Sequence, residues 1–487
     1  MQFVYNFIFA MILIVPFIGL LNSFFTNENF GLQKKINNFT YGTILAFCVL
    51  LVILYSFNGI NYIRLFSISR NIPIIFSSEP FNLSFGITMA VMIFYLNYLF
   101  QDSFNLLNLS DKYVLYNQQI ACLYILYIFL SFSHDIVVSL LLYTLVLIYS
   151  YFLITNPDLK DFRKDYSIVL TISFISSMIF LCILGFYFIY NGNNLFTFQN
   201  ISKLENIEIY WLLVILFLLI LINLSGPIYF VFKEKFYYED LLPMLVILIF
   251  PFVIFNTFLF TKVLYYVFYN NISNVGLYFY YSGFFLIVIF LLLLFLNFKY
   301  IKNGVKFILL FGFLNFIIFF SQFLFLNTAE ELAKLYVNFL LLVFGITISI
   351  LSYSAVLFEL LKLNTTSIGT IYKYSKLKVN LFFIAEFLPI FMNFYSFLSL
   401  DFNNFNVLYF INMLELFVLL GVYITHIIIT VRKKTNNIEE EKQIIKKLQQ
   451  GGGIVSDYKI QMTLISVFYT LFSFRSMIID FISSNTH

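Results

Sequence analysis

The chain has 487 residues, of which 61% are hydrophobic and only 11% are charged. Soluble domains carry about 25% charged residues, so this composition excludes an ordinary soluble enzyme and indicates one integral membrane domain. Three Cys, far apart in apolar segments, and three His exclude a disulfide framework and any site that needs several His ligands, such as a haem–copper centre.

Apolar segments of about 20 residues recur from the beginning of the chain to its end, and each is long enough to cross a bilayer as a helix. We therefore expect an all-α integral membrane protein with about fourteen spans. The fourth and fifth spans are separated only by Ser133, His134 and Asp135. The expected spans are 2–23, 41–59, 83–100, 118–133, 136–155, 167–190, 209–232, 242–268, 276–297, 305–326, 335–361, 379–400, 407–430 and 460–483.

The distribution of Lys and Arg tests this count. Loops on the non-translocated side of a membrane protein collect these residues. Of the 28 Lys and Arg, 22 lie in loops after odd-numbered spans and four in loops after even-numbered spans. Omission of one span would scramble the alternation, so the pattern supports fourteen. Both termini then lie on the side poor in Lys and Arg, and topology explains the net charge of +4 without a nucleic-acid partner.

Proline inside two spans indicates interrupted helices, because Pro lacks an N–H and clashes with the preceding helical turn. Span 7 is expected to break at Ser225, Gly226 and Pro227, and span 12 at Leu388 and Pro389. The two spans lie five apart. Two inverted five-helix repeats would place these breaks in corresponding helices, which is the pattern of a transporter-type path. The alternative is that two ordinary proline kinks coincide.

These repeats divide the chain into four expected parts. The parts are an N-terminal three-helix segment (1–117), a first repeat (118–270), a second repeat (271–430), and a basic loop with a surface helix and the last span (431–487). The surface helix is indicated by Ile438, Ile445 and Leu448 on one face, and three glycines at 451–453 end it.

Charged residues inside spans are costly, at least ~2.5–3.5 kcal/mol near the bilayer centre, so each needs a reason. Lys262 lies in span 8, Glu386 in span 12 beside the expected break, and Glu415 near the middle of span 13. We expect these three to form a buried proton relay, and the alternative is that they pair to hold helices together or reach the interface. Three further residues lie close enough to span ends to favour the interface: Glu359, His426 and Arg475.

Neutral polar residues inside the spans could line a hydrated path, although hydrogen bonds between packed helices explain them equally well. These residues are Asn223, Ser225, Asn256, Thr257, Asn315, Ser321, Gln322, Ser352 and Ser354.

Several short strings carry a family resemblance. The string from Asp135 to Thr144 is similar to the fifth span of the antiporter-like membrane subunits of respiratory complex I, the proton-pumping NADH:quinone oxidoreductase. The surroundings of Pro227 are similar to that family's broken helix 7, and those of Pro389 and Asn393 to its broken helix 12. The resemblance covers spans 4–14 and implies fourteen helices, inverted repeats, and proton movement driven by quinone reduction elsewhere in the complex.

The chain also departs from that family. The family's key Glu of span 5 is matched here by Thr144, the Lys of helix 7 by Ile222, and the Lys of helix 12 by Phe397. The usual Glu–Lys pair of the first half-channel is therefore absent. Lys262 and Glu386 are then the ionisable residues that remain, and Thr144 marks the position where the first path has lost its acid.

Within the family, a chain that ends after span 14 favours subunit types 2 and 4 over the longer type 5, and loss of the Glu–Lys pair favours type 2. The abundance of Phe, Tyr, Ile and Asn, with a single Trp, indicates an AT-rich genome. We therefore expect the mitochondrial inner membrane, with a bacterial plasma membrane as the alternative.

The function expected from the resemblance is proton translocation by a non-redox subunit of NADH:ubiquinone oxidoreductase. Such a subunit binds no cofactor or metal itself, and its partners are other membrane-arm subunits and lipids. Two alternatives stay open. One is a structural subunit of a respiratory complex with a degenerate path, and the other is a lipid-linked oligosaccharide flippase or multidrug exporter of an AT-rich organism.

Overall fold

The computed structural model describes most of the N-terminal third and the C-terminal third of the chain. The described residues are 2–25, 30–69, 72–106, 110–154, 304–322, 329–363, 368–400, 407–432 and 458–484, with isolated positions at 171–182, 288 and 292. They are mostly helical and belong to two compact units, which are treated separately below.

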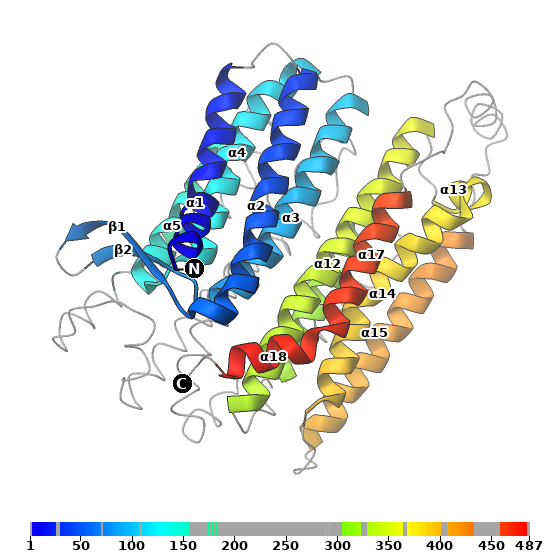
Figure 1. The fold of residues 1–487 in the computed structure, drawn as a ribbon. Helices are drawn as coiled ribbons and strands as arrows, with labels where there is room; N and C mark the ends of the chain where they lie inside the picture. Colours follow the sequence, from blue (N-terminus) through cyan, green and yellow to red (C-terminus); the bar gives the residue numbers. More distant parts are fainter. Residues whose placement is uncertain are drawn as a thin grey trace. The chain divides into compact units, whose positions relative to one another are not determined.

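The first unit contains a bundle of helices and a two-stranded antiparallel sheet (Figure 1). Its described elements are α1 (Gln2–Phe25), α2 (Phe30–Asn58), β1 (Tyr62–Ser69), β2 (Ile72–Ser77), α3 (Pro80–Leu106), α4 (Ser110–Phe132) and α5 (Ile136–Ile154). Helix α1 packs against α2 and α4, and α3 packs against α2 and α4. The predicted separation of the fourth and fifth spans is confirmed, because α4 ends at Phe132 and α5 begins at Ile136.

Close packing at a glycine holds α3 against α4 in this unit. Phe132 is fully buried, and its ring meets the ring of Phe9 edge to face at a centroid distance of 5.5 Å. Gly86 of α3 lies directly beside Phe132, where a Cβ would come within 2.4 Å of the ring. A side chain at this position would force Phe132 or one of the two helices to shift.

The sheet was not expected, since the sequence indicated an all-α chain. Strand β1 pairs with β2 from Tyr62 opposite Ser77 to Ser69 opposite Ile72, with two register irregularities between. The segment is rich in Ile, Phe and Ser and too short to cross a membrane, so it forms a hairpin outside the spans. An isolated bridge between Phe76 and Ser133 attaches the hairpin to the α4–α5 connection.

The second unit is a helical bundle in which α12 and α14 pack together most extensively (Figure 1). Its described helices are α11 (Gly304–Ser321), α12 (Ala329–Leu363), α13 (Ile368–Tyr374), α14 (Lys376–Leu398), α15 (Val407–Arg432), α17 (Tyr458–Ser473) and α18 (Arg475–Ser484). The last expected span differs from the structure, because the chain turns at Phe474 and α18 leaves the axis of α17.

Helix α14 is continuous across Pro389, which differs from the interruption expected there. Proline fits helical backbone angles, and only its own N–H is lost, so the carbonyl of Ala385 receives no bond from that position. Gly345 of α12 packs against this point, where a Cβ would lie 3.4 Å from the nitrogen of Pro389 and 3.5 Å from the carbonyl carbon of Leu388. The neighbouring helix thus covers the proline peptide closely.

Among the described residues, five helices are long and apolar enough to cross a membrane, so the protein is a multi-pass membrane protein. These segments are Gln2–Phe25, Gly31–Asn58, Ala333–Tyr353, Lys376–Leu398 and Tyr409–Arg432. The predicted count of fourteen and the inverted repeats stay predictions. Spans 6–9, the break at Ser225, Gly226 and Pro227, and the surface helix after Arg432 lie outside or almost entirely outside the described residues.

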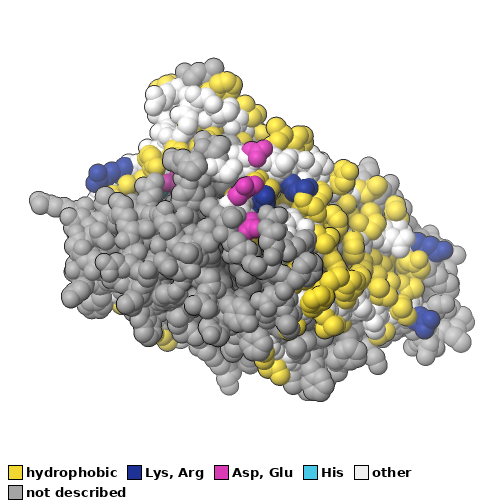
Figure 2. All heavy atoms as spheres, turned by 90° about the horizontal axis from the view of Figure 1, so that it is seen from below, with side chains coloured by type: hydrophobic (Ala, Val, Ile, Leu, Met, Phe, Trp, Pro, Cys, Tyr) yellow, Lys and Arg dark blue, Asp and Glu magenta, His cyan; other side chains and the backbone are white. Residues whose placement is uncertain are grey.

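Part of the described surface is apolar. Figure 2 shows hydrophobic side chains spread over the right of the view, with Lys and Arg at the right edge and again beside Asp and Glu near the centre. On α15 the outward side chains are large and apolar at helical spacing, as a lipid-facing surface requires. They are Phe410, Met413, Leu414, Phe417, Ile424 and Ile428.

Candidate functional site

Two carboxylates lie inside the second bundle. Glu386 of α14 is 0% exposed and Glu415 of α15 is 1% exposed. Both helices are long and apolar enough to span a membrane, so each carboxyl group is buried at a level where an unneutralised charge is expensive. Among the described residues, neither oxygen of either carboxyl group accepts a hydrogen bond. These two predicted residues therefore face the bundle interior and not the lipid.

His426 lies beside Glu386, although the sequence favoured a place at the interface. Its side chain is 1% exposed, and its Nε2 is 3.8 Å from Oε1 of Glu386. The same Nε2 lies 3.4 Å from the hydroxyl oxygen of Thr430, one turn further along α15. Nothing in the sequence pairs residues 386 and 426. The spacing from Glu415, eleven residues or about three turns, is the one signal that places His426 on the same helix face.

Amide side chains form a second cluster between α11 and α14. Asn393 donates from Nδ2 to Oδ1 and to the backbone oxygen of Asn315, at 2.8 and 3.1 Å. Gln322 donates to the backbone oxygen of Asn393 at 3.0 Å. All three side chains are fully buried. The predicted polar residues Asn315 and Gln322 thus contact Asn393 of α14, which lies seven residues after Glu386 on the same helix.

The buried polar residues of α15 share one face of the helix. Asn412, Glu415 and His426 are spaced by three and eleven residues, which returns each to the same side of a helix with 3.6 residues per turn. Asn412 donates to the hydroxyl oxygen of Ser321. From Asn412 to His426 the row covers about 21 Å of helix axis, against roughly 30 Å for the hydrocarbon core of a bilayer.

Several acceptor oxygens of this row, of the amide cluster and of Glu386 have no donor among the described residues. They are the amide oxygens of Gln322, Asn393 and Asn412 and the carboxylate oxygens of Glu386 and Glu415. A buried acceptor without a partner costs about 1–3 kcal/mol, so such atoms are rare in purely structural cores. Five residues of this kind along one interface indicate a polar interior that water or a transferred proton would stabilise.

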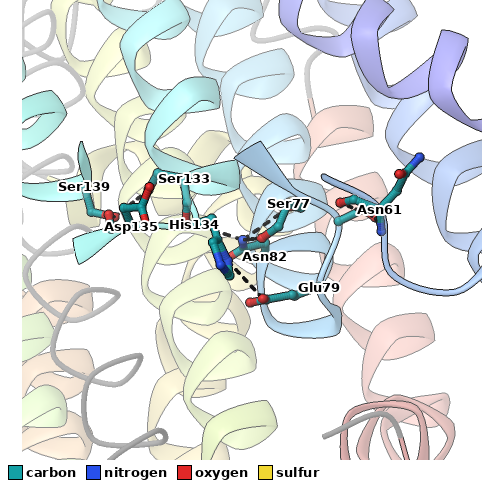
Figure 3. Close-up of polar contacts among 9 residues, drawn as sticks. Asn61, Ser77, Glu79, Asn82, Ser133, His134, Asp135 and Ser139 are labelled. Atoms are coloured by element: carbon teal, nitrogen blue, oxygen red, sulfur yellow. Dashed lines mark hydrogen bonds and ion pairs between the residues drawn. The ribbon is translucent and has the colours of Figure 1, made fainter. Parts of the chain in front are cut away.

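A separate polar cluster lies in the first unit, at the base of the hairpin (Figure 3). Nδ1 of His134 is 3.0 Å from Oε1 of Glu79, and both side chains are buried. The backbone N–H of His134 donates to the carbonyl of Ile75 at 3.0 Å. Asn82 donates to the hydroxyl of Ser77 at 2.7 Å and to the carbonyl of Ser133 at 3.4 Å. These contacts fasten the hairpin to the α4–α5 connection.

Thr144 also lies in the first unit. Its side chain is buried in α5, and its hydroxyl donates to the carbonyl of Leu141 at 2.7 Å, within its own helix. The remaining predicted site residues, Lys262 with Ser225, Gly226 and Pro227, lie outside the described residues. Of the predicted set, the structure therefore places Glu386, Glu415 and Pro389 in one bundle.

Arg475, at the start of α18, contacts aromatic rings. Its guanidinium carbon lies 4.1 Å from the ring centroid of Tyr395 and 4.7 Å from that of Phe472. Stacking of this kind stabilises a cation that has lost part of its water. No group of three or more His, Cys, Asp or Glu side chains able to hold a metal ion occurs within the described part of the chain.

No protein-family model and no curated protein match the sequence. Solved structures match in fold. A chain of respiratory complex I from Thermus thermophilus with bound NADH is similar at a TM-score of 0.61 and 12% identity, over 95% of this chain and 99% of that chain. A chain of the membrane-bound sulfane sulfur reductase, an archaeal respiratory membrane complex, is similar at a TM-score of 0.60 and 12% identity, over 90% of this chain and 74% of that chain.

A chain of the Mrp complex from Dietzia sp. DQ12-45-1b gives a TM-score of 0.60 and 10% identity, over 97% of this chain and 56% of that chain. At these identities the likeness concerns the fold. The chain therefore has the fold of chains that occur in multi-subunit membrane complexes, among them respiratory ones.

Proposed function

We propose that the chain is a proton-translocating subunit in the membrane arm of a respiratory complex. The observation that carries this proposal is the buried row from Asn412 through Glu415 to Glu386 and His426, with carboxyl groups fully inside an apolar bundle. A carboxyl group can hold a proton as the neutral acid and release it as the anion, so two such groups provide resting places for a proton within the membrane.

The resemblance in the sequence and the fold shared with a chain of complex I support a finer proposal. The complex would be NADH:ubiquinone oxidoreductase, and this chain a non-redox subunit most similar to type 2, with type 4 next. Energy from quinone reduction elsewhere in the complex would move protons along the row. The expected setting is the mitochondrial inner membrane, with a bacterial plasma membrane as the alternative. Its expected partners are other membrane-arm subunits and lipids, and it would bind no cofactor itself.

Two inverted repeats, 118–270 and 271–430, belong to this proposal, with Lys262 as a further member of the path and the break at Ser225, Gly226 and Pro227 as the counterpart of Pro389. The described row lies in the second repeat. The second repeat would then carry the working path, and Thr144 would mark the altered first one.

The test is replacement of Glu386 by Gln in the assembled complex, with proton pumping measured per NADH oxidised. Gln keeps the size and polarity of the side chain but cannot bind and release a proton at neutral pH. Loss of a positioned proton-transfer group slows transfer by about 100-fold or more, so pumping through this path should stop. Glu330→Gln is the matched control, because Glu330 lies at the exposed start of α12 with its side chain 69% exposed.

A structural subunit without a path is the second candidate, and one observation favours it. Thr144 stands where the family that the sequence resembles has its key Glu, and its hydroxyl donates within its own helix, to the carbonyl of Leu141. Unchanged pumping by Glu386→Gln in a normally assembled complex would favour this candidate. Identification of the proteins retained after mild detergent extraction tests the assignment to a respiratory complex separately.

A further inference from the structure

We propose that His426, together with Thr430, is the residue that loads and unloads Glu386, and that it connects this carboxyl group to the end of the bundle at Arg432. The inference rests on the proposed proton path and names the side from which its central acid exchanges protons. Its basis is the position of Nε2 of His426, which lies between the Thr430 hydroxyl at 3.4 Å and Oε1 of Glu386 at 3.8 Å.

The three side chains form a short chain from the interior toward the helix end. Glu386 and His426 are buried, Thr430 is part-exposed, and α15 ends two residues later at Arg432. From His426 to Arg432 the helix axis advances about 9 Å. Arg432 begins the loop that is richest in Lys and Arg, which the charge pattern places on the non-translocated side. Glu386 therefore has a polar connection to that side.

In the opposite direction, toward Asn393, the next side chains along α14 and α15 are apolar. On α14 the residues between Glu386 and Asn393 are Phe, Leu, Pro, Ile, Phe and Met. On α15 the residues between Glu415 and Tyr423 are Leu, Phe, Val, Leu, Leu, Gly and Val. About 10 Å of helix therefore separates Glu386 from the amide cluster at Asn393 without a polar side chain on either helix. The His426 side is therefore the direction in which polar side chains continue from Glu386.

Other ionisable groups on the elements packed against α15 are few in the described part of the chain. Helix α14 contributes Lys376, Lys378 and Tyr395 besides Glu386, and α13 contributes Tyr372. The described side chains of α11 include none. On α15 itself, Tyr423 donates to the carbonyl of Phe383 at 2.6 Å and is therefore engaged. His426 is the group that contacts the Glu386 carboxyl group directly.

The transfer balances with one proton. The Nε2–H bond of protonated His426 breaks and an O–H bond forms on Oε1 of Glu386, which leaves a neutral imidazole and a neutral acid. The lone pair on Nε2 then accepts the next proton from the side of Thr430. Imidazole is suited to this step because its charge changes in the physiological pH range. The step requires the 3.8 Å separation to shorten to hydrogen-bond distance, about 3.2 Å or less.

The experiment uses the assembled complex in oriented vesicles and compares His426→Gln with Glu386→Gln and with Thr425→Val, an exposed position on α15. Proton uptake is measured from pH 5 to pH 9 on the Arg432 side. We expect Glu386→Gln to abolish uptake through this path. His426→Gln should slow it by about tenfold or more and remove its dependence on pH between about 5 and 8, while Thr425→Val should match the unaltered protein.

An unchanged rate and pH profile for His426→Gln, with uptake lost in Glu386→Gln, overturns the role of His426 and leaves the proposed function standing. Normal uptake in Glu386→Gln overturns both. If the complex with His426→Gln does not assemble, the variant Thr430→Val is tested in its place. This substitution removes the hydroxyl group at nearly constant side-chain volume. That variant should slow uptake with an unchanged NADH oxidation rate, and an unaffected uptake rate also overturns the proposal.

Discussion

Substitution of Gly86 by Ala probes the tightest helix contact of the first unit. A Cβ at this position would lie 2.4 Å from Cζ of Phe132 and 2.9 Å from Cε2, about 1 Å short of the ordinary 3.4 Å contact. Phe132 is fully buried and meets Phe9, also fully buried, so its ring has no free space to enter. Overpacking of this kind costs about 1–3 kcal/mol, and we expect Gly86→Ala to lower the free energy of unfolding by that amount.

The assay is denaturant unfolding of the purified protein in detergent, with Gly421→Ala as the control. Gly421 also lies in a helix, but a Cβ there meets nothing within 4 Å, so its replacement should change stability little or raise it by up to about 1 kcal/mol. Phe132→Leu shortens the opposing side chain and should recover part of the loss in the double variant. Equal stability of Gly86→Ala and Gly421→Ala would refute the argument from the close approach.

Two further predictions concern the buried polar clusters. Asn393→Ala removes both donors to Asn315 and should destabilise the second unit by about 1–3 kcal/mol, measured by the same unfolding assay; a loss no larger than that of an exposed substitution would contradict it. Glu79→Gln removes the carboxylate that faces His134, and hydrogen exchange should become faster at the backbone amide of His134, which bonds to Ile75. Unchanged protection there would mean that the contact between Glu79 and His134 does not fasten the hairpin.

Helix positions followed from the sequence because a bilayer imposes a length and an apolar composition on each span. Helices α1, α4, α5 and α14 begin or end within a few residues of the expected limits, apart from the N-terminal extension of α4 to Ser110. The short connection at His134 was identified because polar residues interrupt two apolar runs there. The hairpin at Tyr62 was missed, since a short apolar segment outside the spans carries no comparable constraint.

The burial of Glu386 and Glu415 was also expected, because a charge within an apolar span must face protein to be stable. The contact between Glu386 and His426 was not expected. His426 lies 40 residues away on another helix, and no local pattern in one sequence states which helix faces are neighbours. Pro389 shows the same limit: its ring predicts a lost hydrogen bond, but whether the helix breaks depends on what packs against it, here Gly345 of α12.

The sequence by itself therefore determined that this is a membrane protein built of many apolar helices with a few costly charges inside, because burial in lipid acts on each segment separately. Only the tertiary structure decided which charges meet. Packing of α14 against α15 brings His426 to 3.8 Å from Glu386, while packing of α11 against α14 brings Asn315 to Asn393. Those contacts depend on helix rotation and neighbourhood, which are properties of the whole bundle.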